Sequence, residues 1–119
     1  MRTMSIEEAA WIGATIDAEG GPFWHAAGQR DKHPYPIVTC ANTDLEIISA
    51  LLRATGIGSV SAAMTSALSN KLCYIWTVGA RKEVVDVLRQ CKPYSPKMQR
   101  FGEEALEKGL IDALVVEEK

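Results

Sequence analysis

The sequence predicts one α+β domain in which an antiparallel sheet carries helices on one of its faces. Its 119 residues, 47% of them apolar, are enough for one hydrophobic core and too few for two. Segments with helical spacing of apolar residues alternate with pairs of strand-like segments, and the strands of each pair are separated by a short polar turn. Two hairpins linked by a helix favour one antiparallel sheet, whose second face stays free.

The first half of the chain is expected to form a helix and a hairpin. Ser5 followed by Glu8 is the pattern of a capping box, and it opens a proline-free run of helix formers over 6–18. The Gly-Gly-Pro sequence that follows is expected to end this helix. Strands are then predicted over 23–29 and 35–41, on either side of a polar turn.

The second half repeats this order. An Asn-Thr-Asp sequence at 42–44 caps a second helix, whose apolar residues keep helical spacing until Gly56. A second hairpin is predicted from strands over 59–64 and 72–78. Alternation along the latter strand places Cys73, Ile75 and Thr77 on one face, and Tyr74, Trp76 and Val78 on the other.

Two further helices complete the single predicted domain, 1–119. The first is marked by the apolar residues of 84–88, and the last extends over 98–114. The core of the domain is expected to cover about 6–108, followed by an acidic C-terminal helix or tail. No internal repeat or low-complexity segment is visible.

Composition restricts the class of protein. No segment approaches the ~20 apolar residues of a membrane-spanning helix, and the N-terminus lacks a signal-peptide pattern. We therefore expect a soluble intracellular protein, in the cytoplasm or an organelle matrix, with no membrane partner. The three cysteines, Cys40, Cys73 and Cys91, have neither zinc-site nor disulfide spacing and are expected to be buried free thiols.

Charge is distributed unevenly along the chain. The net charge of −2 gives no sign of a nucleic-acid partner, because domains that bind nucleic acids tend to be basic. However, six basic residues against two acids give the segment 81–100 a local charge of +4, and the segment 102–119 has a local charge of −4. Either segment can be an ordinary solvated helix face.

One side of the first helix has almost no side-chain bulk. Ala9, Gly13 and Asp17 recur every four residues and therefore share a face, and three alanines lie beside them. Such a face allows close approach by another helix. The expected contact residues are Ala9, Ala10, Gly13, Ala14 and Asp17.

The same helix ends in two acids, Asp17 and Glu19, directly before two glycines. No cation lies nearby in the sequence, and the C-terminal end of a helix is itself electronegative, so two carboxylates there are unfavourable. A bound divalent cation removes that cost. Mg²⁺ suits the position because it prefers oxygen ligands and retains several waters. A solvated helix end is the alternative.

The run Trp11-Ile12-Gly13-Ala14-Thr15-Ile16-Asp17-Ala18-Glu19-Gly20 resembles the LAGLIDADG motif of homing endonucleases. Further matches follow in the order of that family: Asn-Thr-Asp at 42–44, Gly-Ile-Gly-Ser-Val at 56–60, Tyr74-x-Trp76-x-Val78, and Pro93-Tyr94 followed by Lys97. The resemblance covers about 6–108. It implies an αββαββα fold with an antiparallel sheet and helices on one face, and an enzyme that cleaves double-stranded DNA and serves intron or intein mobility.

The resemblance also implies an assembly and a set of site residues. A single motif implies a homodimer, joined at the motif helices, that acts on a palindromic or pseudo-palindromic duplex. Glu19 is implied as the main ligand of catalytic Mg²⁺, with Mn²⁺ as a substitute, and Asp17 as a secondary ligand. Lys97 matches a lysine placed near the reacting phosphate, but Pro96 departs from the pattern, so Arg100 is an alternative. Asn42 matches a residue that holds the attacking water.

Contacts to DNA are expected on the free face of the sheet. Strand parity groups Phe23 with His25 on one face of the first strand, and the resemblance implies that this face meets DNA. Two-stranded ribbons of this kind can enter the major groove. The candidate DNA-binding residues are Phe23, His25, Gln29, Arg30, Lys32, Tyr35, Thr39, Lys71 and Arg100.

Two other functions compete with the nuclease. A maturase or transcription regulator of the same fold would bind DNA or RNA without cleaving it, in keeping with the low net charge. A small protein-interaction domain would require the series of motif matches to be a coincidence.

Overall fold

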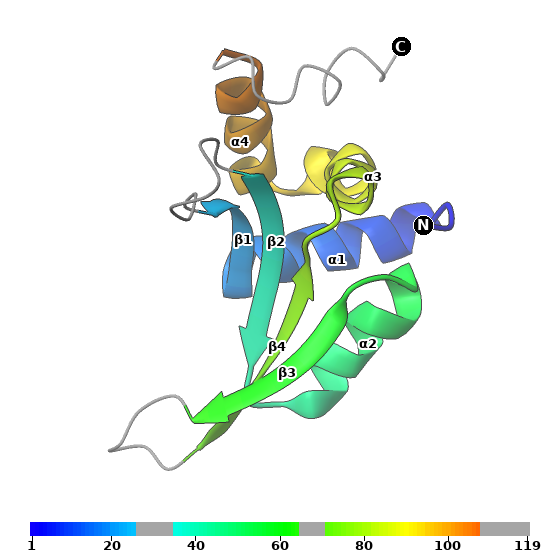
Figure 1. Ribbon diagram of the computed structural model, residues 1–119. Coiled ribbons are helices and arrows are strands. Elements are labelled where there is room, and N and C mark those ends of the chain that lie inside the picture. Colours follow the sequence, from blue (N-terminus) through cyan, green and yellow to red (C-terminus); the bar gives the residue numbers. More distant parts are fainter. Residues whose placement is uncertain (26–34, 65–70, 108–119) are drawn as a thin grey trace.

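In the computed structural model, the eight predicted helices and strands follow the order predicted from the sequence, and a 3-10 turn is added before the last helix (Figure 1). The structure describes residues 1–25, 35–64 and 71–107. Its elements are α1 (Ile6–Glu19), β1 (Gly20–His25), β2 (Tyr35–Asn42), α2 (Leu45–Thr55), β3 (Ser59–Met64), β4 (Leu72–Val78), α3 (Arg81–Cys91), the 3-10 turn η1 (Lys92–Tyr94) and α4 (Pro96–Glu107).

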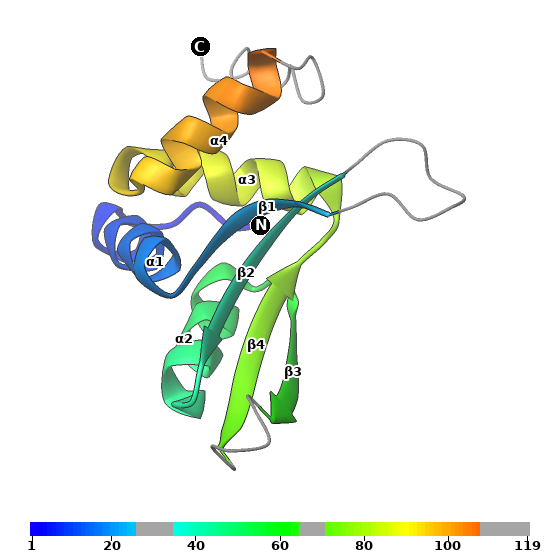
Figure 2. The same cartoon turned by 90° about the vertical axis from the view of Figure 1, so that its left-hand side faces the viewer.

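The four strands form one antiparallel sheet in the order β1-β2-β4-β3. Helices α1, α2 and α3 pack against one face of this sheet, and α4 contacts β1 at its edge (Figures 1 and 2). No helix of the described residues covers the other face, which we call the open face. The predicted fold class is therefore confirmed.

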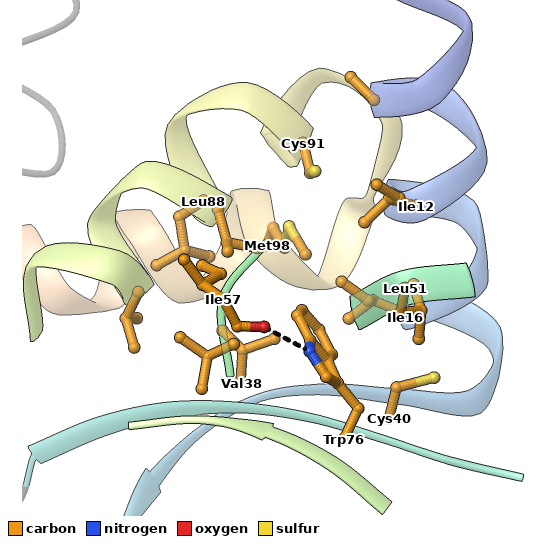
Figure 3. Packing of buried hydrophobic residues seen from close by; sticks show 14 of the residues in the cluster. Ile12, Ile16, Val38, Cys40, Leu51, Ile57, Trp76, Leu88, Cys91 and Met98 are labelled. Carbon is orange, nitrogen blue, oxygen red and sulfur yellow. Dashed lines mark hydrogen bonds between the residues drawn. The ribbon is translucent and has the colours of Figure 1, made fainter. Parts of the chain in front are cut away.

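The core lies between the sheet and the three helices (Figure 3). Trp76 of β4 is fully buried at its centre, among Ile16, Leu51 and Met98. Its indole nitrogen donates a hydrogen bond of 2.9 Å to the backbone oxygen of Ile57, so the one polar atom of this ring is paired. The predicted alternation along β4 is confirmed, because the ring of Trp76 faces the helices.

The start of α1 is capped as the sequence predicts. The Ser5 hydroxyl accepts a hydrogen bond from the Glu8 backbone nitrogen at 3.1 Å, and the Ser5 nitrogen donates to the Glu8 carboxylate at 3.1 Å. At α2, the N-cap is Asp44, whose carboxylate accepts a hydrogen bond from the Glu46 nitrogen at 2.9 Å. Both helices therefore begin where their capping side chains require.

Two element boundaries differ from the prediction. The first strand begins at Gly20 rather than at Phe23, which is possible because β1 is an edge strand, where a proline without a backbone N–H can turn its nitrogen to the unpaired side. The last helix begins at Pro96, since proline at the first helical position loses no intrahelical hydrogen bond. The predicted ends of the first strand and of the last helix lie outside the described residues.

None of the helices within the described ranges is both long and apolar enough to cross a membrane. Of the three predicted buried thiols, Cys40 and Cys91 are buried, and burial raises their pKa values to about 11 and about 12. The prediction is wrong for Cys73, which is partly exposed because its strand position faces the open side of the sheet.

Candidate functional site

The end of α1 is joined to the start of α4 through Asp17. One carboxylate oxygen of Asp17 accepts hydrogen bonds from the Ser95 hydroxyl at 2.8 Å and from the Lys97 backbone nitrogen at 2.9 Å. These bonds, the Lys97 bond first, hold the pKa of Asp17 below its ordinary value. Asp17 therefore binds the electropositive N-terminus of α4, which gives this acid a structural role, while its secondary role as a metal ligand stays a prediction.

Lys97 reaches the backbone just after the other acid of the motif. Its ammonium group donates a hydrogen bond of 2.9 Å to the backbone oxygen of Gly20, the residue that follows Glu19. Lys97 and Glu19 are 78 positions apart in the sequence, and in the fold their side chains line two different grooves at the junction of α1 and β1. Arg100 lies about one helical turn further along α4, and both cations line a groove of about 250 Å³ against β1.

This arrangement changes the electrostatic argument made from the sequence. No cation lies near Asp17 in the sequence, but the fold brings Lys97 and Arg100 close enough for both to act on its carboxylate. The cost of placing two acids at a helix end is therefore relieved in part by the protein itself. Glu19 is then the acid of this pair whose negative charge a bound cation would offset.

Glu19 is exposed, and within the described residues it has no ion-pair or hydrogen-bond partner. Its negative charge adds to burial in raising the pKa of the Cys40 thiol, so the carboxylate lies close to the end of β2. The described part of the chain contains no group of three His, Cys, Asp or Glu side chains that could hold a metal ion. One carboxylate per chain fits Mg²⁺, which commonly takes one or two carboxylates, phosphate oxygens and waters.

Asn42 lines the same groove as Glu19, apart from the groove that contains Lys97. It ends β2, and its side-chain oxygen accepts a hydrogen bond of 2.8 Å from the Asp44 nitrogen, which fixes its orientation before α2. A groove of about 320 Å³ contains both residues. Its lining is Trp11, Ala14, Thr15, Ala18, Glu19, Asn42 and Ile47. The three predicted catalytic residues therefore surround the junction between α1 and β1.

The glycine that ends the motif is required by this junction. A β-carbon at Gly20 would lie 2.0 Å from the backbone oxygen of Thr39, because Gly20 pairs with Cys40 and the backbones of β1 and β2 lie side by side at this point. Backbone cannot move aside as a flexible side chain can. Gly20 thus allows the chain to turn from α1 into the sheet and keeps Glu19 at the sheet's edge.

The outward face of α1 differs from the predicted interface. Ala9 is 5% exposed and Gly13 is buried, both inside the chain. A β-carbon at Gly13 would lie 2.9 Å from the Cys91 backbone oxygen and 2.9 Å from the β-carbon of Tyr94. The prediction that these two residues contact a partner is wrong, because the small face of α1 receives the end of α3 and η1.

Other residues of α1 remain available to a second chain. Trp11 is 42% exposed, and Ala14 and Ala18 are exposed beside it at helical spacing. Ala10 and Asp17 are half-buried at the margins of this stripe. We call Trp11, Ala14 and Ala18 the outward stripe. Of the predicted interface residues, only Ala14 belongs to it.

Replacement of Gly13 should therefore destabilise the single chain. Gly13→Val is expected to lower the free energy of unfolding by about 3 kcal/mol, the upper end for overpacked cores, because the new methyl groups meet backbone. Urea unfolding measures this loss, and Glu7→Val, at an exposed position of the same helix, should change it by less than about 0.5 kcal/mol. A loss that changes with protein concentration would instead place Gly13 between two chains.

The Asp17 contact should make stability depend on pH in a defined direction. Because the pKa of Asp17 is lowered on folding, its charge stabilises the folded chain above the ordinary value of 3.8 and the effect is lost as the pH falls through the lowered pKa. The melting temperature of wild type should exceed that of Asp17→Asn by a constant amount from pH 7 to about pH 5. The difference should shrink below about pH 4, and one that grows there would contradict the assignment.

The predicted DNA-binding residues are only partly placed. Phe23, Tyr35 and Thr39 lie on the open face, where Phe23 is 49% and Tyr35 40% exposed. Lys71 is exposed next to the start of β4, and Arg100 lies off the sheet on α4. The side chain of His25, and the whole of Gln29, Arg30 and Lys32, lie outside the described residues.

Some site residues were missed by the sequence analysis. Trp11 and Ala18 of the outward stripe, and Ile37, Ile75 and Thr77 of the open face, were not among the candidates. Strand parity already grouped Ile75 with Thr77, so the two could have been found by extending the DNA-facing assignment to β4. The exposure of Trp11 depends on which neighbour covers the other side of α1, and no sequence pattern indicates that.

The fold of this chain is similar to those of two solved homing endonucleases. The homing endonuclease I-CvuI, solved with DNA and magnesium and with the DNA not cleaved, matches 93% of this chain and 74% of its own at a TM-score of 0.63 and 15% identity. The archaeal intron-encoded homing endonuclease I-Vdi141I, solved in complex with DNA, matches 89% of this chain and 70% of its own, with a TM-score of 0.59 and 18% identity. No protein-family model and no curated protein matches the chain. These similarities show the fold that the LAGLIDADG resemblance implied.

Proposed function

We propose that this protein is a site-specific, Mg²⁺-dependent endonuclease that cleaves double-stranded DNA as a homodimer. The observation that carries the proposal is the hydrogen bond of Lys97 to Gly20, which fixes an ammonium group at the backbone that directly follows Glu19. A carboxylate free to hold a metal ion and a fixed cation at the same helix-to-strand junction are groups that can stabilise phosphodiester hydrolysis. The fold shared with two DNA-bound homing endonucleases supports the choice of substrate.

Each residue of the site has a separate role in this proposal. Glu19 holds the cation, which when bound supplies Lewis-acid stabilisation of the phosphate and of the leaving oxygen. Lys97 offsets the negative charge that develops on the phosphoryl group. The amide of Asn42, fixed by its bond to Asp44, orients the attacking water. Mn²⁺ should substitute for Mg²⁺, since both accept oxygen ligands.

The homodimer follows from the presence of one Glu19 per chain. Cleavage of both strands of a duplex needs two sites, and the described chain supplies one Glu19 with one Lys97. Two chains joined at the outward stripes of α1 bring their Glu19 residues to one axis, because Glu19 ends the same helix. Two-fold symmetry of the protein then favours a palindromic or pseudo-palindromic target.

A non-cleaving relative that binds DNA or RNA is the second candidate function. The interactions of Asp17 favour it, because the presence of this acid is explained by the start of α4 and no longer argues for catalysis. Glu19 favours the nuclease, since a carboxylate beside phosphates weakens binding unless a cation neutralises it.

The two candidates are separated by selection followed by cleavage. A randomised duplex library is first bound in Ca²⁺, which occupies oxygen sites and often supports the chemistry poorly, and the selected duplexes are then transferred to Mg²⁺ or Mn²⁺. A nuclease should cut both strands at one position in the selected sequence. Tight selection without cleavage in either metal would favour the non-cleaving relative.

Lys97→Ala should slow this cleavage by about 10²–10³-fold, the usual cost of removing one group that stabilises the transition state. Binding of the selected duplex should change only a few-fold, because most phosphate contacts remain. Lys82→Ala, at an exposed position on α3, is the matched control and should cleave normally. Equal rates for the two variants would remove Lys97 from the site and favour Arg100.

A further inference from the structure

The open face of the sheet is organised in rows that run across the strands. One row consists of Gly21, Thr39, Thr77 and Ser59, which are paired in register across all four strands. On one side of this row Phe23 lies opposite Ile37, and on the other side Ala41 lies opposite Ile75. Two apolar pairs therefore flank a row of small and hydroxyl-bearing residues.

The chemistry of this face is unusual for a surface that reads DNA. The described side chains that its four strands place on this face include no charged residue and no amide, and Lys71 lies just before the start of β4. Its hydrogen-bonding groups are the hydroxyls of Ser, Thr and Tyr and the thiol of Cys73. Guanine and adenine are commonly read by two hydrogen bonds from Arg, Lys, Asn or Gln, and the described face offers none of these. What it offers instead is exposed apolar surface, with Phe23 alone 49% exposed.

We propose that Phe23, Ile37 and Ile75 recognise thymine through its methyl group, so that the target is selected for T·A pairs at these contacts. The proposal rests on the proposed function. The thymine methyl is the apolar group that base pairs present in the major groove, and side chains such as Phe and Ala contact it. The cations Lys97 and Arg100 stand beside β1, where they can meet the phosphates of a duplex lying on this face.

The register fixes the spacing of the two contacts. Ile37 and Ala41, which mark the two apolar pairs along β2, are four residues apart, or about 13 Å at the rise of an antiparallel strand. Successive nucleotides of one strand are about 3.4 Å apart along the duplex axis. A ribbon that follows the groove should therefore prefer thymine at two positions about four base pairs apart in each half-site.

The test uses the full chain and the duplex selected from a randomised library in Ca²⁺. Each thymine of the selected site is replaced in turn by deoxyuridine, which removes the methyl group and leaves every hydrogen-bonding group of the base in place. At two positions per half-site, affinity should fall about fourfold, the value of one buried methyl group. A 5-methylcytosine placed where cytosine replaces such a thymine should recover part of the loss.

Protein variants assign each methyl group to a side chain. Ile75→Ala should abolish the deoxyuridine penalty at one position and leave the other, and Phe23→Ala should show the reverse. Val60→Ala is the matched control, since Val60 lies opposite Trp76 on the helix-covered face and should keep both penalties. If Ile75→Ala is unstable, the smaller change Ile75→Val replaces it and should reduce the deoxyuridine penalty in part.

Two results would overturn the inference: one leaves the proposed function in place, and the other removes the proposed function as well. If a duplex is selected tightly and no deoxyuridine substitution changes affinity by even twofold, the open face does not read methyl groups, while the proposed function stands. If no duplex is selected and the open face is instead covered by another protein or a second copy, the proposed function fails together with the inference.

Discussion

Glu19→Gln is expected to abolish strand cleavage while the chain stays folded and bound to its duplex. The substitution keeps the shape of the side chain and removes the charge that holds the cation. Loss of the cation should slow cleavage by at least about a thousandfold, or about 4 kcal/mol of transition-state stabilisation. Folding should be unaffected, because Glu19 is exposed and has no hydrogen-bond or ion-pair partner within the described residues.

Binding by this variant should be equal to or tighter than that of wild type in the absence of metal. A carboxylate about 4 Å from a phosphate opposes binding by about 1 kcal/mol in a wet site, so its removal should strengthen binding by about fivefold. Nicking assays in Mg²⁺ and Mn²⁺ and binding assays without metal measure the two effects separately. Glu103→Gln, at an exposed position of α4, removes an equal charge and should leave both unchanged.

Normal cleavage by Glu19→Gln would exclude the proposed metal ligand and with it the reason for a two-fold site. If wild type itself binds a selected duplex and never cuts it, and Glu19→Gln binds no better, the non-cleaving relative takes the place of the nuclease. The contrast between binding and cleavage therefore decides more than either measurement alone.

Local features of the fold could be predicted from the sequence because they depend on residues close together in the chain. The capping box of Ser5 and Glu8, the cap at Asp44 and the alternation around Trp76 each involve neighbours within a few positions. Their order then restricts the topology to few possibilities, since adjacent hairpins pair in one sheet. The motif that ends at Gly20 also falls at the junction of α1 and β1, where the candidate site is proposed.

Long-range neighbours could not be predicted in this way. Small side chains on α1 predicted a close contact with another helix, and the structure contains such a contact, but Gly13 meets Cys91 and Tyr94 of its own chain. The pattern is the same for a contact within a chain and for one between chains. Likewise, the bond between Asp17 and Lys97 depends on where α4 begins, and Pro96 marks that start only once the surrounding packing is known.

Ala14→Glu is expected to separate the proposed dimer into single chains. Trp11 is 42% exposed beside Ala14. Covering it in an interface removes roughly 100 Å² of apolar surface from contact with water, which stabilises the interface by about 2.5 kcal/mol per chain. Two carboxylates facing each other across the axis would oppose this contact and raise the dissociation constant by at least about a hundredfold. Sedimentation equilibrium at micromolar concentration should change from twice the 13.0 kDa of one chain to the mass of one.

Loss of the dimer should also remove double-strand cleavage, because a single chain carries one Glu19 and one Lys97 and covers one half-site. Ala80→Glu, which adds the same carboxylate at an exposed alanine before α3, should remain dimeric and active, so it separates an effect of position from one of charge. The chain stability of Ala14→Glu should stay close to that of wild type, in contrast to Gly13→Val, since Ala14 is exposed and Gly13 is buried. A wild-type protein that sediments as one chain yet cuts both strands at one position would show that the outward stripe serves another contact, and that two sites are not needed together.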